Sequence, residues 1–176
     1  MASIEERLND YEEIRKKALD KYSAYRPVPC LAFGGELIHF TSEGFNHLVY
    51  PKPKKPRDPR AQILRFDMLD RGKKILEVSS TFQEYEEYLE YKKVNRRGKY
   101  IELPTVIKMW GFVAVIQNFR VKVVVRQEGN GKRQFLSVAP AWFTKQYRDM
   151  KLIHNSVGSG LANEDDGEVL KNATTM

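Results

Sequence analysis

Residues 44–60, GFNHLVYPKPKKPRDPR, place a histidine beside a concentrated positive charge. His47 can transfer a proton, because imidazole is the side chain that titrates near neutral pH. The proline-rich loop after it carries five cations and one acid, and such a cluster attracts phosphate groups. Together these features predict chemistry at a phosphodiester. The five cations, which we expect to bind RNA, are Lys52, Lys54, Lys55, Arg57 and Arg60.

A second group of cations lies in the predicted strand RVKVVVR, residues 120–126. Arg120, Lys122 and Arg126 have the even spacing that places side chains on one face of a strand. Ser137, in the next predicted strand, can donate a hydrogen bond to the same face. Metal-independent RNA cleavage requires a base, an acid, and cations that stabilise the phosphorane. His47, Lys122, Arg126 and Ser137 are therefore candidate catalytic residues, and Arg120 is a candidate RNA-binding residue.

Each feature also has a purely structural interpretation. His47 can be a partly buried residue of an apolar turn, and alternating cations are typical of a solvated sheet face. The basic loop can be a solubilising linker, and Ser137 an ordinary strand residue. The other chemistries lack support: the lone cysteine, Cys30, has no identifiable partner, and the three histidines lack metal-ligand spacing. We therefore predict no metal and no cofactor.

Helices are expected mainly in the first half of the chain. Ser3 and Glu6 form a capping-box pattern that begins a helix over residues 3–22. Thr41 or Ser42 should cap a short helix that carries His47 and ends near Val49. Asp58-Pro59 is a strong start for a helix that ends near Gly72. Residues 80–94 fit either a helix or a strand, and their spacing favours a helix.

The last third of the sequence is rich in strand-forming residues. KYIEL, TVIKMWGFVAVIQ, RVKVVVRQ and RQFLSVA are predicted strands, and EGNGK is a predicted hairpin turn. Two earlier strand-like pieces flank Gly34-Gly35. Val121, Val123 and Val125 should face the core beneath the N-terminal helices. This order predicts an α+β domain in which N-terminal helices pack on a four-stranded antiparallel β-meander.

Composition indicates one basic globular domain. The chain has 176 residues and a net charge of +7. Residues 155–176 hold four acids and one base, so we predict a domain over residues 1–154 followed by an acidic, disordered tail. The residues before that tail therefore carry a net charge of +10, which favours anionic partners. The longest apolar run has seven residues, and the N-terminus is unlike a signal peptide, so we expect a cytoplasmic protein without a membrane partner.

The order of these features resembles the barnase–EndoU–colicin–RelE-like (BECR-fold) nucleases of phages and bacteria. The resemblance covers about residues 1–150. It lies in GELIHFTSEGFNHLVY with its histidine-bearing turn, in the arginine-rich helix start PRDPRAQILRF, and in the meander from WGFVAVI to RQFLSVAP.

This resemblance implies a metal-independent endoribonuclease, often the toxin of a toxin–antitoxin or phage-conflict system, with an antitoxin or immunity protein as a partner. The family histidine falls on His47, and the strand hydroxyl falls on Ser137. The basic positions fall on Arg60 or Arg65 and on Lys122 or Arg126. The partner acid or base is not placed, and Glu43, His39 and Tyr147 are all candidates.

Two other classes of function compete with this one. A non-catalytic RNA- or DNA-binding module would use the same basic face and would need aromatic stacking platforms. An interaction protein would bind an acidic partner instead. The aromatic residues that can serve as platforms are Tyr91, Tyr100, Phe119 and Phe135.

Overall fold

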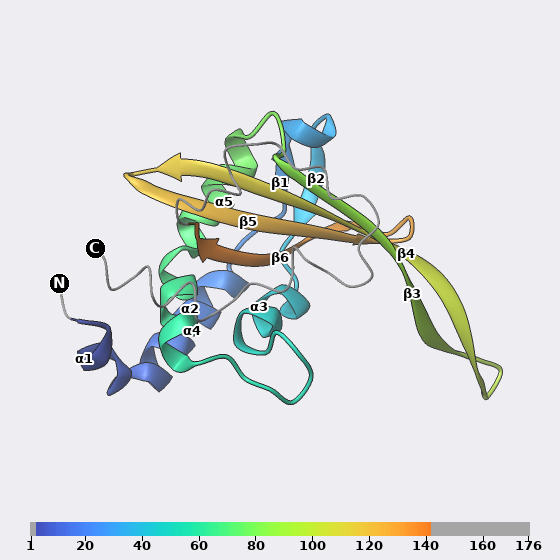
Figure 1. The fold of residues 1–176 in the computed structure, drawn as a ribbon, viewed down its shortest axis with the longest axis horizontal. Coiled ribbons are helices and arrows are strands. Elements are labelled where there is room, and N and C mark those ends of the chain that lie inside the picture. Colours follow the sequence, from blue (N-terminus) through green and yellow to red (C-terminus); the bar gives the residue numbers. More distant parts are fainter. Residues whose placement is uncertain (1–2, 142–176) are drawn as a thin grey trace.

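The computed structural model describes residues 3–141, which fold into helices packed on a six-stranded sheet (Figure 1). Two N-terminal helices replace the single expected one: α1 spans Ile4–Leu8 and α2 spans Tyr11–Ser23. The capping box at Ser3 is confirmed, since its side chain accepts from the Glu6 amide and Glu6 accepts from the Ser3 amide.

A small hairpin follows α2. Strands β1 (Val28–Cys30) and β2 (Glu36–His39) pair antiparallel, and the turn places Gly34 and Gly35 at positive φ. Leu31–Phe33, which we expected to be extended, forms a short 3-10 helix. The hairpin itself is therefore confirmed, but its connection runs over residues 31–35 and is longer than the two glycines that the sequence indicated.

Three helices precede the main sheet: α3 (Ser42–Val49), α4 (Pro59–Asp67) and α5 (Leu69–Val78). Asp58 caps α4 and accepts from the Arg60 amide, as expected. Gly72 does not end a helix, which corrects our prediction. It lies inside α5, where an added Cβ would sit 2.9 Å from Val138 Cγ2, so the glycine lets α5 approach the sheet.

The sheet has the strand order β1-β2-β6-β5-β4-β3 and is mixed, because β2 and β6 run parallel. Strand β3 spans Glu84–Arg96, where we favoured a helix, and it pairs with β4 (Lys99–Ile116) over its whole length. Strand β4 continues through Pro104, which separated two predicted strands. The proline is tolerated because β5 (Phe119–Glu128) pairs only from Ile107 onward.

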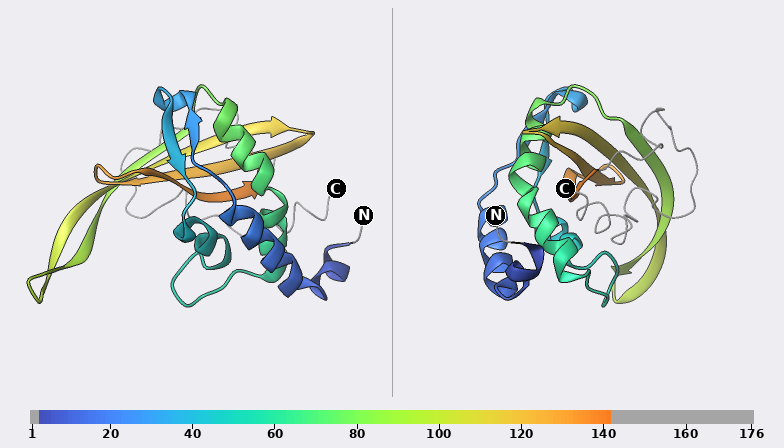
Figure 2. Two further views of the ribbon diagram at one scale, coloured as in Figure 1. Left: turned by 180° about the vertical axis from the view of Figure 1, so that it is seen from behind. Right: turned by 60° about the vertical axis from the view of Figure 1, so that its left-hand side comes forward.

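Strand β6 (Arg133–Pro140) completes the sheet after the expected glycine hairpin. The helices cover one face of the sheet (Figure 2). Val121, Val123 and Val125 belong to the core on that face, as predicted. The opposite face holds a smaller apolar cluster of Ile107, Met109, Val124 and Leu136. The alternation of β5 thus separates a helix-covered face from a second face that carries Lys122 and Arg126.

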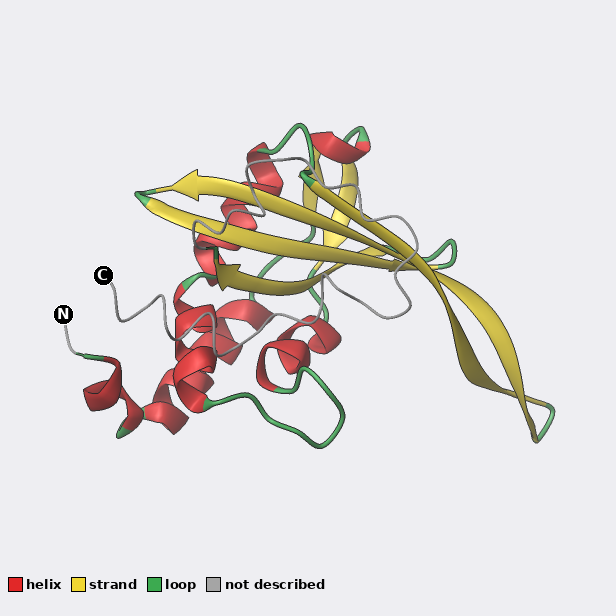
Figure 3. Cartoon of the chain, in the orientation of Figure 1, coloured by secondary structure: helices red, strands yellow, loops and turns green. Residues whose placement is uncertain are grey.

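The α+β class is confirmed, whereas the sheet has six strands rather than four and is not wholly antiparallel. Figure 3 shows the helices gathered beside the sheet and one long hairpin extending past it. Residues 155–176, the predicted acidic tail, lie outside the described residues, as does Tyr147. No helix within residues 3–141 is long and apolar enough to cross a membrane.

Candidate functional site

Helix α3 lies against β6, and Gly44 sets the closeness of that contact. A Cβ on Gly44 would lie 2.4 Å from the Phe135 carbonyl oxygen and 2.4 Å from Tyr22 Oη. Phe45 anchors the same helix by stacking on Phe66 of α4, with ring centroids 5.6 Å apart. Only a glycine permits this approach, so the sequence at this position fixes how near α3 comes to the sheet.

The polar flank of α3 reaches the second face of the sheet through Glu43. Its Oε1 lies 2.8 Å from Nη1 of Arg126 on β5. His47 follows Glu43 by four residues, which places the two side chains on one side of the helix. Arg126 and His47 therefore belong to the same side of the domain.

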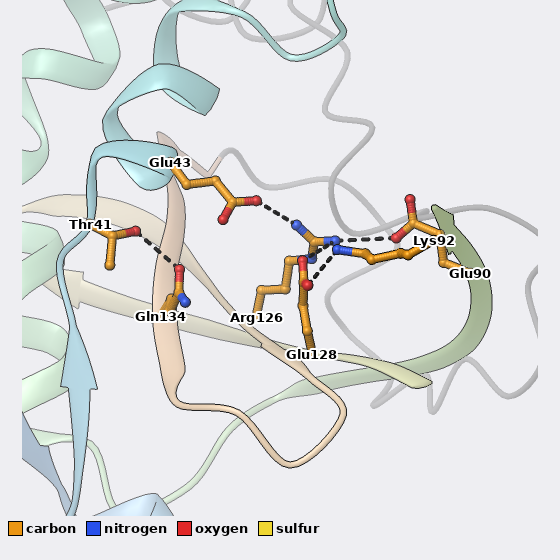
Figure 4. Close-up of polar contacts among 7 residues, drawn as sticks. All are labelled: Thr41, Glu43, Glu90, Lys92, Arg126, Glu128 and Gln134. Atoms are coloured by element: carbon orange, nitrogen blue, oxygen red, sulfur yellow. Dashed lines mark hydrogen bonds and ion pairs between the residues drawn. The ribbon is translucent and has the colours of Figure 1, made fainter. Parts of the chain in front are cut away.

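Arg126 is held by carboxylates from three elements (Figure 4). Besides Glu43, its Nη2 lies 3.3 Å from Glu90 Oε2 on β3 and 2.8 Å from Glu128 Oε1 on β5. Glu128 also pairs with Lys92. We call these five residues the Arg126 cluster. It joins α3, β3 and β5, and its two cations and three acids give a formal charge of −1.

The predicted basic row on β5 is not one open cationic strip. Lys122 is buried, and its Nζ lies 2.7 Å from Glu84 Oε2. Arg120 and Arg126 are six residues apart, which is about 20 Å along a strand, so they cannot hold the same phosphate. Ser137 pairs with Val124, midway between Lys122 and Arg126. Ser137 is itself fully buried. It lies between these two cations along the sheet, whereas Arg120 lies too far along the strand to join them.

Helix α4 brings Arg65 to Ser137. Arg65 is fully buried, and its Nη1 donates to Ser137 Oγ at 3.3 Å and to the Val138 carbonyl at 3.1 Å. Within residues 3–141, β2 pairs with β6 only at Arg133 and Gln134. The rest of this edge of β6 packs against α3 and α4. The Arg65 guanidinium therefore donates both to the Val138 carbonyl at the edge of the sheet and to the Ser137 hydroxyl.

Arg57 departs from the expectation that the loop side chains stay in solvent. It is only 3% exposed, and its Nε donates to the His47 carbonyl at 3.3 Å. Gln62 Nε2 donates to the Arg57 carbonyl at 2.9 Å, so the loop end is fixed to α4. Burial of an arginine requires such partners. Arg57 thus ties the carboxyl end of α3 to the loop that follows it.

The remaining predicted RNA-binding residues are more exposed. Lys52, Lys54 and Lys55 point from the loop into solvent, and Lys54 has a positive φ. Arg60 is ion-paired with Asp58, at 2.8 Å, and with Glu5, at 3.4 Å. The three lysines form the open part of the loop, and Arg60 belongs to the start of α4.

Of the candidate partner groups, Glu43 is engaged with Arg126, and His39 pairs with Gln134 across β2 and β6. Gln134 in turn contacts Thr41, with Oγ1 and Oε1 3.0 Å apart (Figure 4). Burial raises the pKa of the Cys30 thiol, which disfavours a thiolate nucleophile. Within residues 3–141, no group of His, Cys, Asp and Glu side chains is arranged to hold a metal ion.

Sequence reasoning missed the acidic side of this region. Glu90 and Glu128 were not candidates, because a helix predicted over residues 80–94 is incompatible with the pairing of β3 with the sheet. The alternation of acids in EYEEYLE is a weak signal of a strand that has cations next to one of its faces.

Comparison with models of protein families, with curated proteins and with solved structures found no match to this chain.

Proposed function

We propose that this protein is a metal-independent endoribonuclease. The observation that carries the proposal is the packing of α3 and α4 along one edge of β6. That packing brings α3, which carries His47, and α4, which carries Arg65, against the strand that carries Ser137. Arg65 contacts Ser137 directly, and the α3 flank with His47 is tied to Arg126 by Glu43.

The proposed reaction is an internal transfer at phosphorus. A base removes the 2′-hydroxyl proton, the 2′-oxygen bonds to phosphorus, and the bond to the 5′-oxygen breaks as an acid protonates that oxygen. A cyclic phosphate and a free 5′-hydroxyl result. His47 supplies one of the two proton-transfer groups. Arg65, Ser137 and Lys122 stabilise the negative charge of the phosphorane, which is worth most where water is excluded.

The resemblance to BECR-fold nucleases supports the same proposal. Strands β3 to β6 form four consecutive antiparallel strands within the larger sheet, and the N-terminal helices cover one of its faces. The catalytic groups fall on the edge and on the opposite face. A toxin-like role, and an antitoxin or immunity protein as a partner, belong to this proposal through the resemblance.

The decisive experiment is cleavage of 5′-labelled RNA in the presence of EDTA, followed by mapping of the ends. His47→Ala should lower turnover by about 10²–10⁴-fold, which is the usual contribution of a general acid or base. Asn46→Ala, an exposed change in the same helix, is the matched control and should cleave like wild type. If both proteins are folded and His47→Ala cleaves RNA within a few-fold of the wild-type rate, then His47 has only a structural role and the proposed mechanism is wrong.

A non-catalytic RNA-binding module is the second candidate, because the exposed lysines of the loop can bind phosphates, whereas the cations expected to act in catalysis are already paired with acids. Lys122 is neutralised by Glu84, and Arg126 by three carboxylates. Arg126→Ala separates the two functions. If Arg126 assists the transition state, kcat should fall more than RNA affinity. Loss of affinity alone, without any RNA cleavage by the wild type above that of a parallel mock preparation, selects the binding module.

A further inference from the structure

The β3–β4 hairpin continues well past the sheet (Figure 1). Strand β5 pairs with β4 only from Ile107, whereas β3 and β4 pair with each other out to Arg96 and Lys99. We call residues 91–104 the arm. From Glu90, at the Arg126 cluster, to the turn at Gly98 is eight residues, or about 26 Å of extended strand. The arm is therefore a two-stranded ribbon that adds nothing to the core.

The arm is the most basic continuous segment outside the loop. It holds five cations and one acid, so its formal charge is +4 out of a net +7 for the whole chain. Within residues 3–141, ion pairs were found for only one of the five, Lys92. The four exposed cations without one are Lys93, Arg96, Arg97 and Lys99. Glu102, the one acid of the arm, is the cross-strand partner of Lys93. A ribbon whose exposed cations outnumber its acids in this way is suited to phosphate groups.

One face of the arm continues the face that carries the candidate site. Glu84, Glu90 and Lys92 of β3 contact Lys122, Arg126 and Glu128 of β5, so even-numbered residues of β3 lie on the site side. Arg96 keeps this parity, and Lys99 is its cross-strand partner. A chain bound at the site can therefore pass the Arg126 cluster and continue along the same face onto the cations of the arm.

The other face of the arm carries two exposed aromatic rings. Tyr91 is 67% exposed and Tyr100 is 75% exposed, although large apolar rings usually pack. Exposed aromatic residues interleaved with cations are what single-stranded nucleic acids bind, because every base has a face that can stack. Neither ring lies in the core clusters, so packing in the core does not account for them.

We propose that the arm is an RNA-binding element. It holds the sugar–phosphate backbone of an RNA that extends from the site at Ser137, through Arg96, Arg97 and Lys99, while Tyr91 and Tyr100 stack on unpaired bases. The choice of RNA rests on the proposed function. The Arg126 cluster links the arm to α3 by Glu90 and Glu43, so the arm has a fixed position relative to His47. Substrates are consequently long single-stranded segments rather than dinucleotides.

The test is binding of a fluorescein-labelled, 30-nucleotide, 2′-O-methyl RNA to the full chain, measured by anisotropy between 50 and 400 mM salt. This probe has no free 2′-hydroxyl, so binding is measured whether or not the protein cleaves RNA. The arm variant combines Arg96→Gln, Arg97→Gln and Lys99→Gln. The control combines Lys16→Gln, Lys17→Gln and Lys74→Gln, which removes the same charge from exposed helix positions.

Loss of three phosphate contacts should flatten the salt slope by about 2 log units per log unit of salt. If the arm variant and wild type have equal affinity at 1 M salt, this change of slope means that the variant binds RNA about 50-fold more weakly at 0.15 M salt. The control should keep the wild-type slope. Tyr91→Ser with Tyr100→Ser should weaken RNA binding by about 30-fold or more without changing the slope, because stacking is uncharged.

An arm variant that binds like the control overturns the inference, and so does a wild-type protein that does not bind the probe. A change of oligomeric state in the arm variant, with RNA binding unchanged, assigns the arm to self-association and also overturns it. The two proposals fail separately. Arm-dependent binding without any RNA cleavage rejects the nuclease alone, whereas cleavage of long RNA at the wild-type rate by the arm variant rejects the arm alone.

Discussion

Gly44→Ala should push α3 away from β6. The added Cβ would lie 2.4 Å from the Phe135 carbonyl and from Tyr22 Oη, about 1.0 Å short of the 3.4 Å at which ordinary contact begins. Neither neighbour can retreat easily: one is backbone, and Tyr22 is buried and donates to the Thr41 carbonyl at 2.9 Å. The helix has to move instead.

Overpacking of this kind costs about 1–3 kcal/mol, and the better helix propensity of alanine returns up to about 1 kcal/mol. We expect a net loss of about 1–2 kcal/mol, or about 2–8 °C in Tm for a chain of this size. Thermal and urea unfolding measure it, with Asn46→Ala as the control in the same helix. An alanine at position 44 that met no obstruction would stabilise α3. A Tm of Gly44→Ala equal to or above that of wild type would therefore refute the close contact of Gly44 with Phe135 and Tyr22.

A double-mutant cycle connects this change to the site. A displacement of about 1 Å would stretch the 2.8 Å contact between Glu43 and Arg126 beyond hydrogen-bonding distance. Glu43→Gln should then cost less in the Gly44→Ala background than in wild type. The Glu43 side chain is 56% exposed, so the difference should be only a few tenths of a kcal/mol, about 0.2–1. Strict additivity would mean that α3 keeps its place.

Two further expectations concern the loop and the helix that follows it. Neutralising Lys52, Lys54 and Lys55 should flatten the salt dependence of RNA binding by about 0.7 log units per contact, while Tm stays unchanged; an unchanged slope returns the loop to a solubilising role. Asp58→Ala should cost about 1 kcal/mol at pH 7, because the side chain caps α4. Hydrogen bonding from the Arg60 guanidinium lowers the pKa of Asp58 below its ordinary 3.8, so this stabilisation is complete above that pH and is lost as pH falls through the lower, folded-state pKa. Urea unfolding at pH 7 and pH 3 should show the gap between wild type and variant narrowing, and a gap independent of pH would contradict the assignment.

Local signals in the sequence predicted local structure well. The Ser3 capping box, the Asp58-Pro59 helix start and the EGNGK hairpin each depend on contacts between residues a few positions apart. Strand β3 was predicted wrongly for the opposite reason. The spacing of Phe82, Tyr85 and Leu89 fits a helix, but thirteen pairs with β4 hold the segment extended. Pairing partners outside the segment decide its conformation.

The candidate site was predictable as residue types but not as a set of contacts. Chemistry alone selected His47, Lys122, Arg126 and Ser137 as groups that can act on a phosphodiester. The carboxylates that pair with Lys122 and Arg126 depend on the register of β3, and the burial of Arg57 depends on Gln62 of α4. Such contacts form only when segments distant in the sequence pack together. The periodic patterns of apolar and polar residues used for prediction therefore do not reveal them.

The contact between Arg65 and Ser137 can form only late in the translation of the chain. The two residues are 72 positions apart, and α4 can meet β6 only after β6 has been translated. At about 5–20 residues per second, a ribosome needs about 4–14 s to cover that interval. The helices and the β1–β2 hairpin can form earlier, because their contacts are short in sequence. A nascent chain therefore carries His47 and Arg65 for seconds before the strand that bears Ser137 is made. Under the proposed function, any activity that depends on the contact between Arg65 and Ser137 would begin only once β6 is in place.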